Sequence, residues 1–272
     1  MKIRESAAIH YFQKKKYLAV DEFVDEDVAK HIVDQYVALA KEDTENELND
    51  SQCPINSKAF YGQPKCEYVM VDCLPKMEAL TGLNLFPTYT YMRVYGPGEF
   101  LHQHQDRPSC EISVTINLGQ SNDFDWPIWY SDPEDLTVKM PVSVPPLSAM
   151  IYRGCEVPHW REEMITPKKD DWQVQLFLHY VNRFGPFSEF AYDRREKLFI
   201  EPFGTSEVYK ELQSITDNDR NVRFDIVKED LESIKNRSKV KAVKKLQEAK
   251  ESKALWLANH NDGYDEESNT LF

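Results

Sequence analysis

The spacing of apolar residues changes along the chain, and the regions it defines predict different kinds of structure. In the first region, Tyr17-Leu18-Ala19-Val20 is typical of a short strand. Asp25, a residue type that caps helix N-termini, comes next. Beyond it, apolar residues recur with a period close to 3.6, the repeat of a helix, at Val28, Ile32, Tyr36 and Leu39. We therefore expect a strand and then a helix that packs one face on a core.

From residue 89 to residue 180 the apolar residues follow the alternation that is typical of strands. The strand candidates are residues 89–95, 110–118, 127–130, 149–152 and 174–181. Turn residues separate them, and the first candidate ends in Gly96-Pro97-Gly98. Several short strands divided by turns predict an all-β sandwich or barrel.

The last region, from about residue 207, has a different character. Few turn residues occur over 227–258, which favours one or two charged helices. Within it, residues 235–245 are basic and contain no Asp or Glu. A solvated helix face is the simpler interpretation, and a surface for a protein partner or nucleic acid is the alternative. We divide the chain into a core domain, 1–200, and a charged, mainly helical C-terminal extension, 201–272.

The composition and net charge of the chain argue against several classes of function. The 272 residues include 33 Lys and Arg against 46 Asp and Glu, a formal net charge of −13. Such an acidic chain is a poor general binder of nucleic acid or anionic membrane, so neither is an expected partner. No run of 18 apolar residues occurs, and the first residues lack the apolar segment of a secretory signal. No GxGxxG or P-loop motif occurs either.

The five cysteines are odd in number, widely spaced and without a CxxC pair. That pattern argues against a disulfide framework and against a cysteine zinc site. We therefore expect reduced thiols, and with them a cytoplasmic localisation.

The segment from Gly98 to Arg107 carries the strongest chemical signal. His102, His104 and Asp106 are spaced two residues apart, so on extended backbone they share one face. A further histidine, His159, follows the strand candidate 149–152. Two imidazoles and one carboxylate form a facial triad that leaves three positions open on six-coordinate Fe(II). The same three ligands also bind zinc. His102 is the alternative to His104, and His179, inside an apolar strand candidate, is the alternative to His159.

The order Tyr95-Gly-Pro-Gly, His104-Gln-Asp106, a strand and then His159 resembles the prolyl 4-hydroxylase-like Fe(II)/2-oxoglutarate-dependent dioxygenases. The resemblance covers roughly residues 17–181. It implies a mainly β fold with flanking helices, whose core is a double-stranded β-helix of the jelly-roll, cupin-like kind. It also implies that His104, Asp106 and His159 bind Fe(II), that Tyr95 lies near 2-oxoglutarate, and that dioxygen is the second co-substrate.

One departure from the family pattern concerns the far carboxylate of 2-oxoglutarate. The resemblance implies an Arg or Lys about ten residues after the distal histidine, at the start of the last core strand. Counting gives Lys168 and Lys169, but Pro167-Lys-Lys-Asp-Asp171 is typical of a loop. Arg161 is the competitor, because it lies two residues after His159 and shares its face if that segment is extended. The choice between Arg161 and Lys169 stays open, and Trp172 or Gln173 is an alternative occupant of the usual position.

The resemblance implies an enzyme that hydroxylates an unactivated C–H bond and releases succinate and CO2. The favoured target is a prolyl or other amino-acid side chain, in a peptide or in a small amino-acid-like molecule. His102, Arg107, Trp129 and Trp160 flank the site in sequence, and we expect them around the substrate or behind the ligands. Pairing with an acidic neighbour is the alternative for Arg107, and core packing is the alternative for the tryptophans. The rival functions are a non-catalytic binding or scaffold protein with a vestigial metal site and, last, a cupin-like metal enzyme without 2-oxoglutarate.

Overall fold

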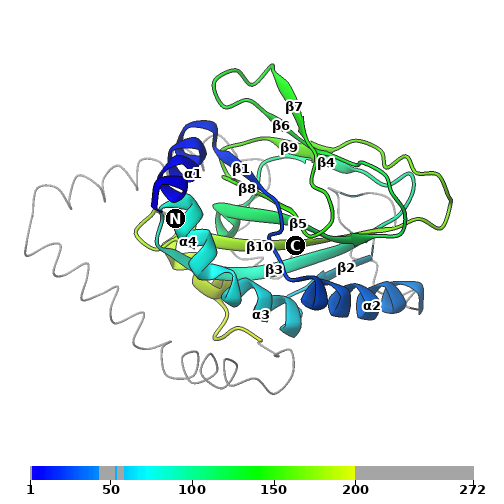
Figure 1. Cartoon of the computed structure of the whole chain (residues 1–272). Helices are drawn as coiled ribbons and strands as arrows, with labels where there is room; N and C mark the ends of the chain where they lie inside the picture. Colours follow the sequence, from blue (N-terminus) through cyan, green and yellow to red (C-terminus); the bar gives the residue numbers. More distant parts are fainter. Residues whose placement is uncertain (1, 43–52, 54–57, 200–272) are drawn as a thin grey trace, which may run out of the picture.

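Two antiparallel sheets face each other in the computed structural model, which describes residues 2–42, 53 and 58–199 (Figure 1). The larger sheet has the order β1-β8-β5-β10-β3-β2. The smaller sheet has the order β4-β9-β6-β7. This arrangement confirms the mainly β, double-stranded β-helix core expected from the sequence. The larger sheet consists of β1 (Tyr17–Val20), β8 (Ala149–Tyr152), β5 (Ile112–Gln120), β10 (Gln173–Asn182), β3 (Leu85–Tyr95) and β2 (Lys58–Tyr61), and the smaller of β4 (Leu101–His104), β9 (His159–Arg161), β6 (Ile128–Ser131) and β7 (Lys139–Val142).

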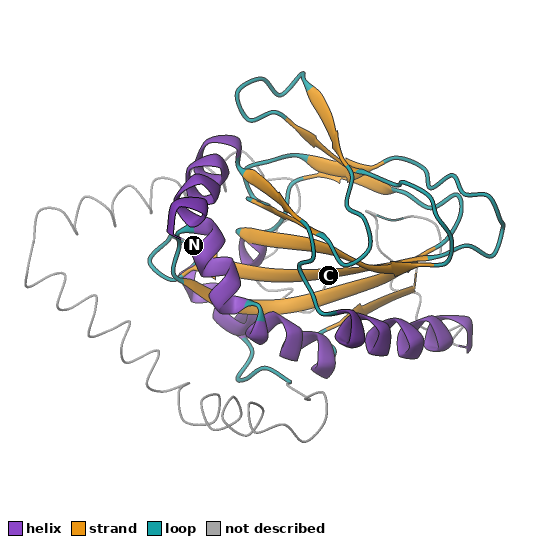
Figure 2. Ribbon diagram, in the orientation of Figure 1, coloured by secondary structure: helices purple, strands orange, loops and turns teal. Residues whose placement is uncertain are grey.

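Helices cover the outer face of the larger sheet (Figure 2). They are α1 (Lys2–Lys15), α2 (Glu26–Glu42), α3 (Pro64–Asp72) and α4 (Leu74–Thr81), and two short 3-10 helices are η1 (Pro108–Cys110) and η2 (Ser188–Arg194). The main apolar core lies between these helices and the sheet, and includes Phe12, Ile32, Met77, Met92, Ile116 and Leu176. Burial of this apolar surface is the main free energy that holds the helices on the sheet.

Helix α2 begins where the sequence predicts. The Asp25 carboxylate accepts a hydrogen bond from the Asp27 backbone N–H at 2.9 Å, which satisfies a donor that the first turn leaves open. Ile32 and Tyr36 are buried as expected. Leu39 is 39% exposed, and Val33 is buried beside Ile32 instead.

The inner face of the larger sheet differs from the outer one. Along β3 the residues alternate, so that Met92 belongs to the core under the helices while Tyr91, Arg93 and Tyr95 line the space between the sheets. This polar and aromatic interior is where functional side chains can meet.

The predicted helical extension over 201–272, including the basic stretch 235–245, lies outside the described residues. The division into two domains at residue 200 therefore remains a prediction. No helix among the described residues combines the length and the apolar character needed to cross a membrane. All five cysteines are free and buried.

A buried carboxyl next to β5 makes stability depend on pH. Glu111 accepts a hydrogen bond from the Asn182 backbone N–H at 2.7 Å, yet burial raises its pKa from 4.5 to about 7. The folded chain therefore binds a proton that the unfolded chain has released, and stability falls as pH rises from about 4.5 to 7.

We predict that Glu111→Gln, which keeps the acceptor and removes the charge, gains stability relative to wild type as pH rises. The expected gain between pH 5 and pH 8 is about 1–3 kcal/mol, measured by urea unfolding at each pH. Glu163→Gln, at an exposed glutamate, is the control and should show no such gain. A Glu111→Gln effect that is the same at both pH values would contradict the assignment.

Candidate metal centre

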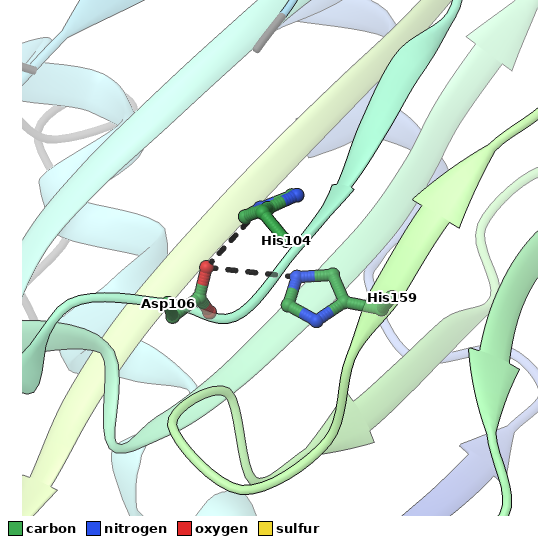
Figure 3. A group of neighbouring side chains, drawn as sticks. All are labelled: His104, Asp106 and His159. Atoms are coloured by element: carbon green, nitrogen blue, oxygen red, sulfur yellow. Dashed lines mark ion pairs between the residues drawn. The ribbon is translucent and has the colours of Figure 1, made fainter. Parts of the chain in front are cut away.

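Three side chains from both strands of the β4–β9 pair and the loop after β4 converge on one point (Figure 3). His104, the last residue of β4, pairs in register with His159, the first residue of β9. The Nε2 atom of each histidine lies 3.5 Å from Oδ1 of Asp106. His159 is 1% exposed, and the side chains of His104 and Asp106 are 14% and 11% exposed. The two nitrogens and one oxygen form a compact donor set that can hold a divalent metal ion.

The backbone fixes the tautomer of both histidines. His104 Nδ1 donates a hydrogen bond to the backbone carbonyl of His102 at 2.8 Å, and His159 Nδ1 donates one to the carbonyl of Val157 at 2.8 Å. Because a carbonyl only accepts, each Nδ1 carries the proton and each Nε2 keeps its lone pair. Both lone pairs are therefore available on the side that faces Asp106.

The second carboxylate oxygen of Asp106, Oδ2, is fixed by a hydrogen bond. Ser113 donates a hydrogen bond from Oγ to Oδ2 of Asp106 at 2.9 Å, and the Asp106 backbone N–H donates to the carbonyl of Gly154 at 2.9 Å. His179 Nδ1 lies 2.9 Å from the same Ser113 oxygen. Burial lowers the pKa of His179 to about 4, so its ring is neutral at pH 7. Burial alone raises the pKa of Asp106, but His159 and His104, while each carries a second proton on Nε2, outweigh it and hold that pKa well below its usual range.

A second group of ligand-type side chains shares Asp106. The ligand atoms of Asp106, Cys110 and His179 also lie within 4.8 Å of one another. Burial raises the pKa of the Cys110 thiol well above its usual value, and its sulfur lies 3.1 Å from the Tyr89 hydroxyl. Metal sites use the thiolate, so this group is the poorer metal site. His179 packs against Tyr89 with ring centroids 4.5 Å apart and supports the Asp106 loop through Ser113.

A cavity opens between the sheets at the triad. It is lined by Tyr89, Tyr91, Arg93, Tyr95, Leu101, His104, Asp106, Ile128, Tyr152, His159, Phe177 and His179. The Tyr95 hydroxyl in this lining is buried and has no hydrogen-bond partner among the described residues. Arg161 is 1% exposed and donates from Nη1 to the backbone carbonyl of Trp126 at 2.6 Å. Its Nε and Nη2 atoms are buried without a hydrogen-bond partner in the part of the chain that the structure describes, and burial lowers its pKa to about 10.

The remaining candidates from the sequence lie elsewhere. Lys169 is exposed in the segment between β9 and β10 and does not line the cavity. Trp160 follows His159 on a strand, so it points to the other face of the smaller sheet and stacks on Trp129 with ring centroids 6.1 Å apart. His102 is exposed and contributes its backbone carbonyl to His104.

Arg107 binds an acidic neighbour rather than facing the metal ligands. Its two terminal nitrogens each lie 2.9 Å from a carboxylate oxygen of Asp193, a bidentate pair. Ser109 also donates to Asp193, at 2.7 Å. This pairing ties the loop after Asp106 to η2, and it follows the alternative that the sequence left open for Arg107.

Sequence reasoning missed three residues that shape the site. Ser113 and Gly154 hold Asp106, and only the folded chain brings them together. Arg93 had a signal, because it stands two residues before Tyr95 and therefore shares its face on a strand.

We predict that Gly154→Ala weakens metal binding. A Cβ at this position would overlap the Asp106 carboxylate and the Cys110 carbonyl, so the carboxylate must move. The expected loss of Co(II) affinity, measured by calorimetry, is about 10- to 100-fold. The control is Gly96→Ala, whose Cβ would meet nothing closer than 3.8 Å and should bind Co(II) like wild type. Equal affinities in the two variants would refute this account of Asp106.

No protein-family model and no curated protein matches the chain. Solved structures do match it. A Pseudomonas putida prolyl-4-hydroxylase aligns with a TM-score of 0.51 and 14% identity, over 64% of this chain and 97% of that one. The non-heme α-ketoglutarate-dependent epimerase SnoN from nogalamycin biosynthesis aligns with a TM-score of 0.55 and 7% identity, over 67% and 84%. HygX from Streptomyces hygroscopicus, solved with nickel and 2-oxoglutarate bound, aligns with a TM-score of 0.51 and 9% identity, over 66% and 87%.

At sequence identities of 7% to 14%, similarity to these solved structures establishes the fold and no more. The fold that the sequence resemblance implies is therefore confirmed. The chain has the prolyl 4-hydroxylase-like double-stranded β-helix of the Fe(II)- and 2-oxoglutarate-dependent oxygenases.

Proposed function

We propose that the chain is an Fe(II)- and 2-oxoglutarate-dependent dioxygenase. The observation that carries this proposal is the His104–Asp106–His159 donor set, whose free Nε2 lone pairs and Oδ1 atom converge inside that fold. Two nitrogens and one oxygen on one face suit Fe(II) and leave positions for a chelating co-substrate and dioxygen. His104, Asp106 and His159 therefore hold the iron.

Arg161 and Tyr95 hold the far carboxylate of 2-oxoglutarate. Nε and Nη2 form one edge of the Arg161 guanidinium, the edge that binds a carboxylate through two parallel hydrogen bonds, and both atoms lack a partner. The buried Tyr95 hydroxyl also lacks a partner and can donate to the same anion. An unpaired buried guanidinium is costly, so a bound carboxylate would stabilise it.

The overall reaction converts a substrate C–H, 2-oxoglutarate and dioxygen into an alcohol, succinate and CO2. One oxygen atom enters the substrate and the other enters the new succinate carboxylate. Iron with 2-oxoglutarate bound supplies the oxidising chemistry. The chain's own residues bind and orient: Ser113 fixes the rotation of the Asp106 carboxylate, and Arg161 fixes the far end of the co-substrate.

The lining of the cavity bears on the choice of substrate. The aromatic side chains of Tyr89, Tyr91 and Phe177 line the cavity and suit a compact apolar group. They support a prolyl or other amino-acid side chain, in a peptide or a small amino-acid-like molecule, as the target. The five free thiols fit the proposed cytoplasmic localisation.

One observation favours the rival reading, a binding or scaffold protein with a vestigial site. At the start of β10, the positions on the same face as the cavity-lining Phe177 and His179 are Gln173 and Gln175, where the family resemblance implies a basic residue. Binding of 2-oxoglutarate separates the two functions, because only the dioxygenase needs it.

The test is an anaerobic titration of the Fe(II)-loaded protein with 2-oxoglutarate, followed by its visible charge-transfer band. We predict a band in wild type and none in His159→Ala, which loses an iron ligand. Arg161→Gln should keep the band but need about 10- to 100-fold more 2-oxoglutarate, the effect of losing a charged hydrogen bond. Lys169→Gln should match wild type, because Lys169 is exposed. If wild-type protein binds Fe(II) but develops no band, the proposal is wrong. If only Lys169→Gln needs more 2-oxoglutarate, the co-substrate contact belongs to Lys169 instead of Arg161.

A further inference from the structure

Helix η2 contains a backbone turn that L-residues adopt only at a cost. Tyr192, Asp193 and Arg194 are consecutive residues with φ angles of 56°, 54° and 58°, in the left-handed region, and none of them is glycine. Aspartate tolerates this region better than most side chains, so Tyr192 and Arg194 carry most of the strain. Such a run persists only where contacts from the surrounding structure hold it, and strained backbone of this kind clusters at functional sites.

The contacts that hold the turn converge on the Asp193 carboxylate. Arg107 donates to both of its oxygens, from Nη1 and Nη2, at 2.9 Å each. The hydroxyl groups of Ser109 and Tyr61 also donate to it, at 2.7 Å and 2.5 Å. The Asp193 side chain is 12% exposed, and these charge-assisted hydrogen bonds satisfy it there. One carboxylate of η2 is therefore bound to two other parts of the chain, β2 and the segment that follows Asp106.

The other side of the turn is anchored to the core. Arg195 forms an ion pair with Glu67, a fully buried residue of α3. It also donates from Nη2 to the backbone carbonyl of Thr88 on β3 at 3.1 Å. The Arg195 backbone N–H closes the turn on the carbonyl of Tyr192 at 3.0 Å. Because Arg195 is fixed to the core, Asp193 is a fixed point to which other segments can be attached.

The segment attached to Asp193 carries a candidate metal ligand. Arg107 directly follows Asp106, and Ser109 stands shortly after it. On the other side, the Asp106 backbone N–H donates to the carbonyl of Gly154 at 2.9 Å. Asp106 thus has one anchor at its own N–H and a second, through Arg107 and Ser109, at Asp193. Without the second anchor, the backbone that aims the Asp106 carboxylate at the histidines is free to shift.

The same carboxylate supports one wall of the cavity. The guanidinium carbon of Arg107 lies 4.5 Å from the ring centroid of Tyr89, a residue that lines the cavity. Tyr61 stacks on Tyr89 with ring centroids 5.0 Å apart, and the Tyr61 hydroxyl is one of the donors to Asp193. Tyr89 therefore packs against two side chains that Asp193 holds.

We propose that Asp193 is a positioning residue for the metal centre, which sets the place of Asp106 through Arg107 and Ser109. The inference rests on the metal binding in the proposed function and adds to it a residue far along the chain. Asp193 is not among the residues that line the cavity, so it acts through the segment it holds. The strained turn delivers its carboxylate to a fixed point beside the Asp106 loop, and the hydrogen bonds of that carboxylate offset the strain.

The test measures Co(II) affinity by calorimetry and the visible d–d spectrum of the Co(II)-loaded protein, neither of which needs 2-oxoglutarate. Asp193→Asn keeps the size of the side chain and suits a left-handed backbone, but it removes the charge. We expect about 10-fold weaker Co(II) binding and a changed d–d spectrum. Arg107→Gln should show the same loss, and combining the two substitutions should add little, because both break one contact. Arg107→Lys, which keeps the charge, should recover part of the loss.

The control is Glu189→Gln, which removes a carboxylate of the same helix that is 48% exposed and lies 3.9 Å from Arg194. It should bind Co(II) with the affinity and spectrum of wild type. Ser109→Ala is a milder change to the same contact, which serves if Asp193→Asn does not fold, and should weaken Co(II) binding about threefold.

Urea unfolding of each variant separates positioning from a merely structural role. Variants that lose stability but keep the Co(II) affinity and spectrum of wild type would overturn the proposal, as would losses that add fully in the double variant. Wild type that binds Co(II) but develops no band with Fe(II) and 2-oxoglutarate would defeat the dioxygenase assignment and not this inference.

Discussion

The contact between the Asp106 carboxylate and two imidazoles is the interaction on which the site depends. One carboxylate oxygen faces His104 and His159, and the other accepts the Ser113 hydroxyl (Figure 3). The two histidines come from paired strands, but Asp106 stands on a loop that must be held in place. Gly154 makes room for it, since any side chain there would overlap the carboxylate. The position of the Asp106 carboxylate thus depends on the close approach of its loop to the loop that contains Gly154, as well as on the three side chains themselves.

The two faces of the larger sheet differ in role: the outer face packs against the helices, and the inner face lines the cavity. The outer face packs apolar residues such as Met92 against the helices and supplies most of the stabilising burial. The inner face carries Arg93, Gln175 and other polar groups that burial disfavours. Hydrogen bonds between amides, such as the one from Gln175 to Gln173, offset part of that cost. Two nitrogens of the buried Arg161 guanidinium have no hydrogen-bond partner among the described residues, which suits them to bind an anion.

Much of the fold and the grouping of the candidate metal ligands can be predicted from the sequence, and the failures have physical causes. His104, Asp106 and His159 stand out because few residue types bind metal and their spacing is tied to strand alternation. Because side chains on a strand alternate between its two faces, Trp160 points away from the cavity and Arg93 points into it. Helix α1 escapes prediction because its apolar residues form no clear stripe, although Phe12 is fully buried. Ser113 and Gly154 reach Asp106 only through tertiary contacts, which no local pattern encodes.

Anomalous diffraction from crystals grown with Co(II) and 2-oxoglutarate tests the central claim most directly. The account predicts one metal peak at about 2.0–2.3 Å from Nε2 of His104, Nε2 of His159 and Oδ1 of Asp106. It also predicts 2-oxoglutarate density that runs from the metal towards Arg161. A peak among Asp106, Cys110 and His179, or a co-substrate whose far carboxylate does not meet Arg161, would contradict it.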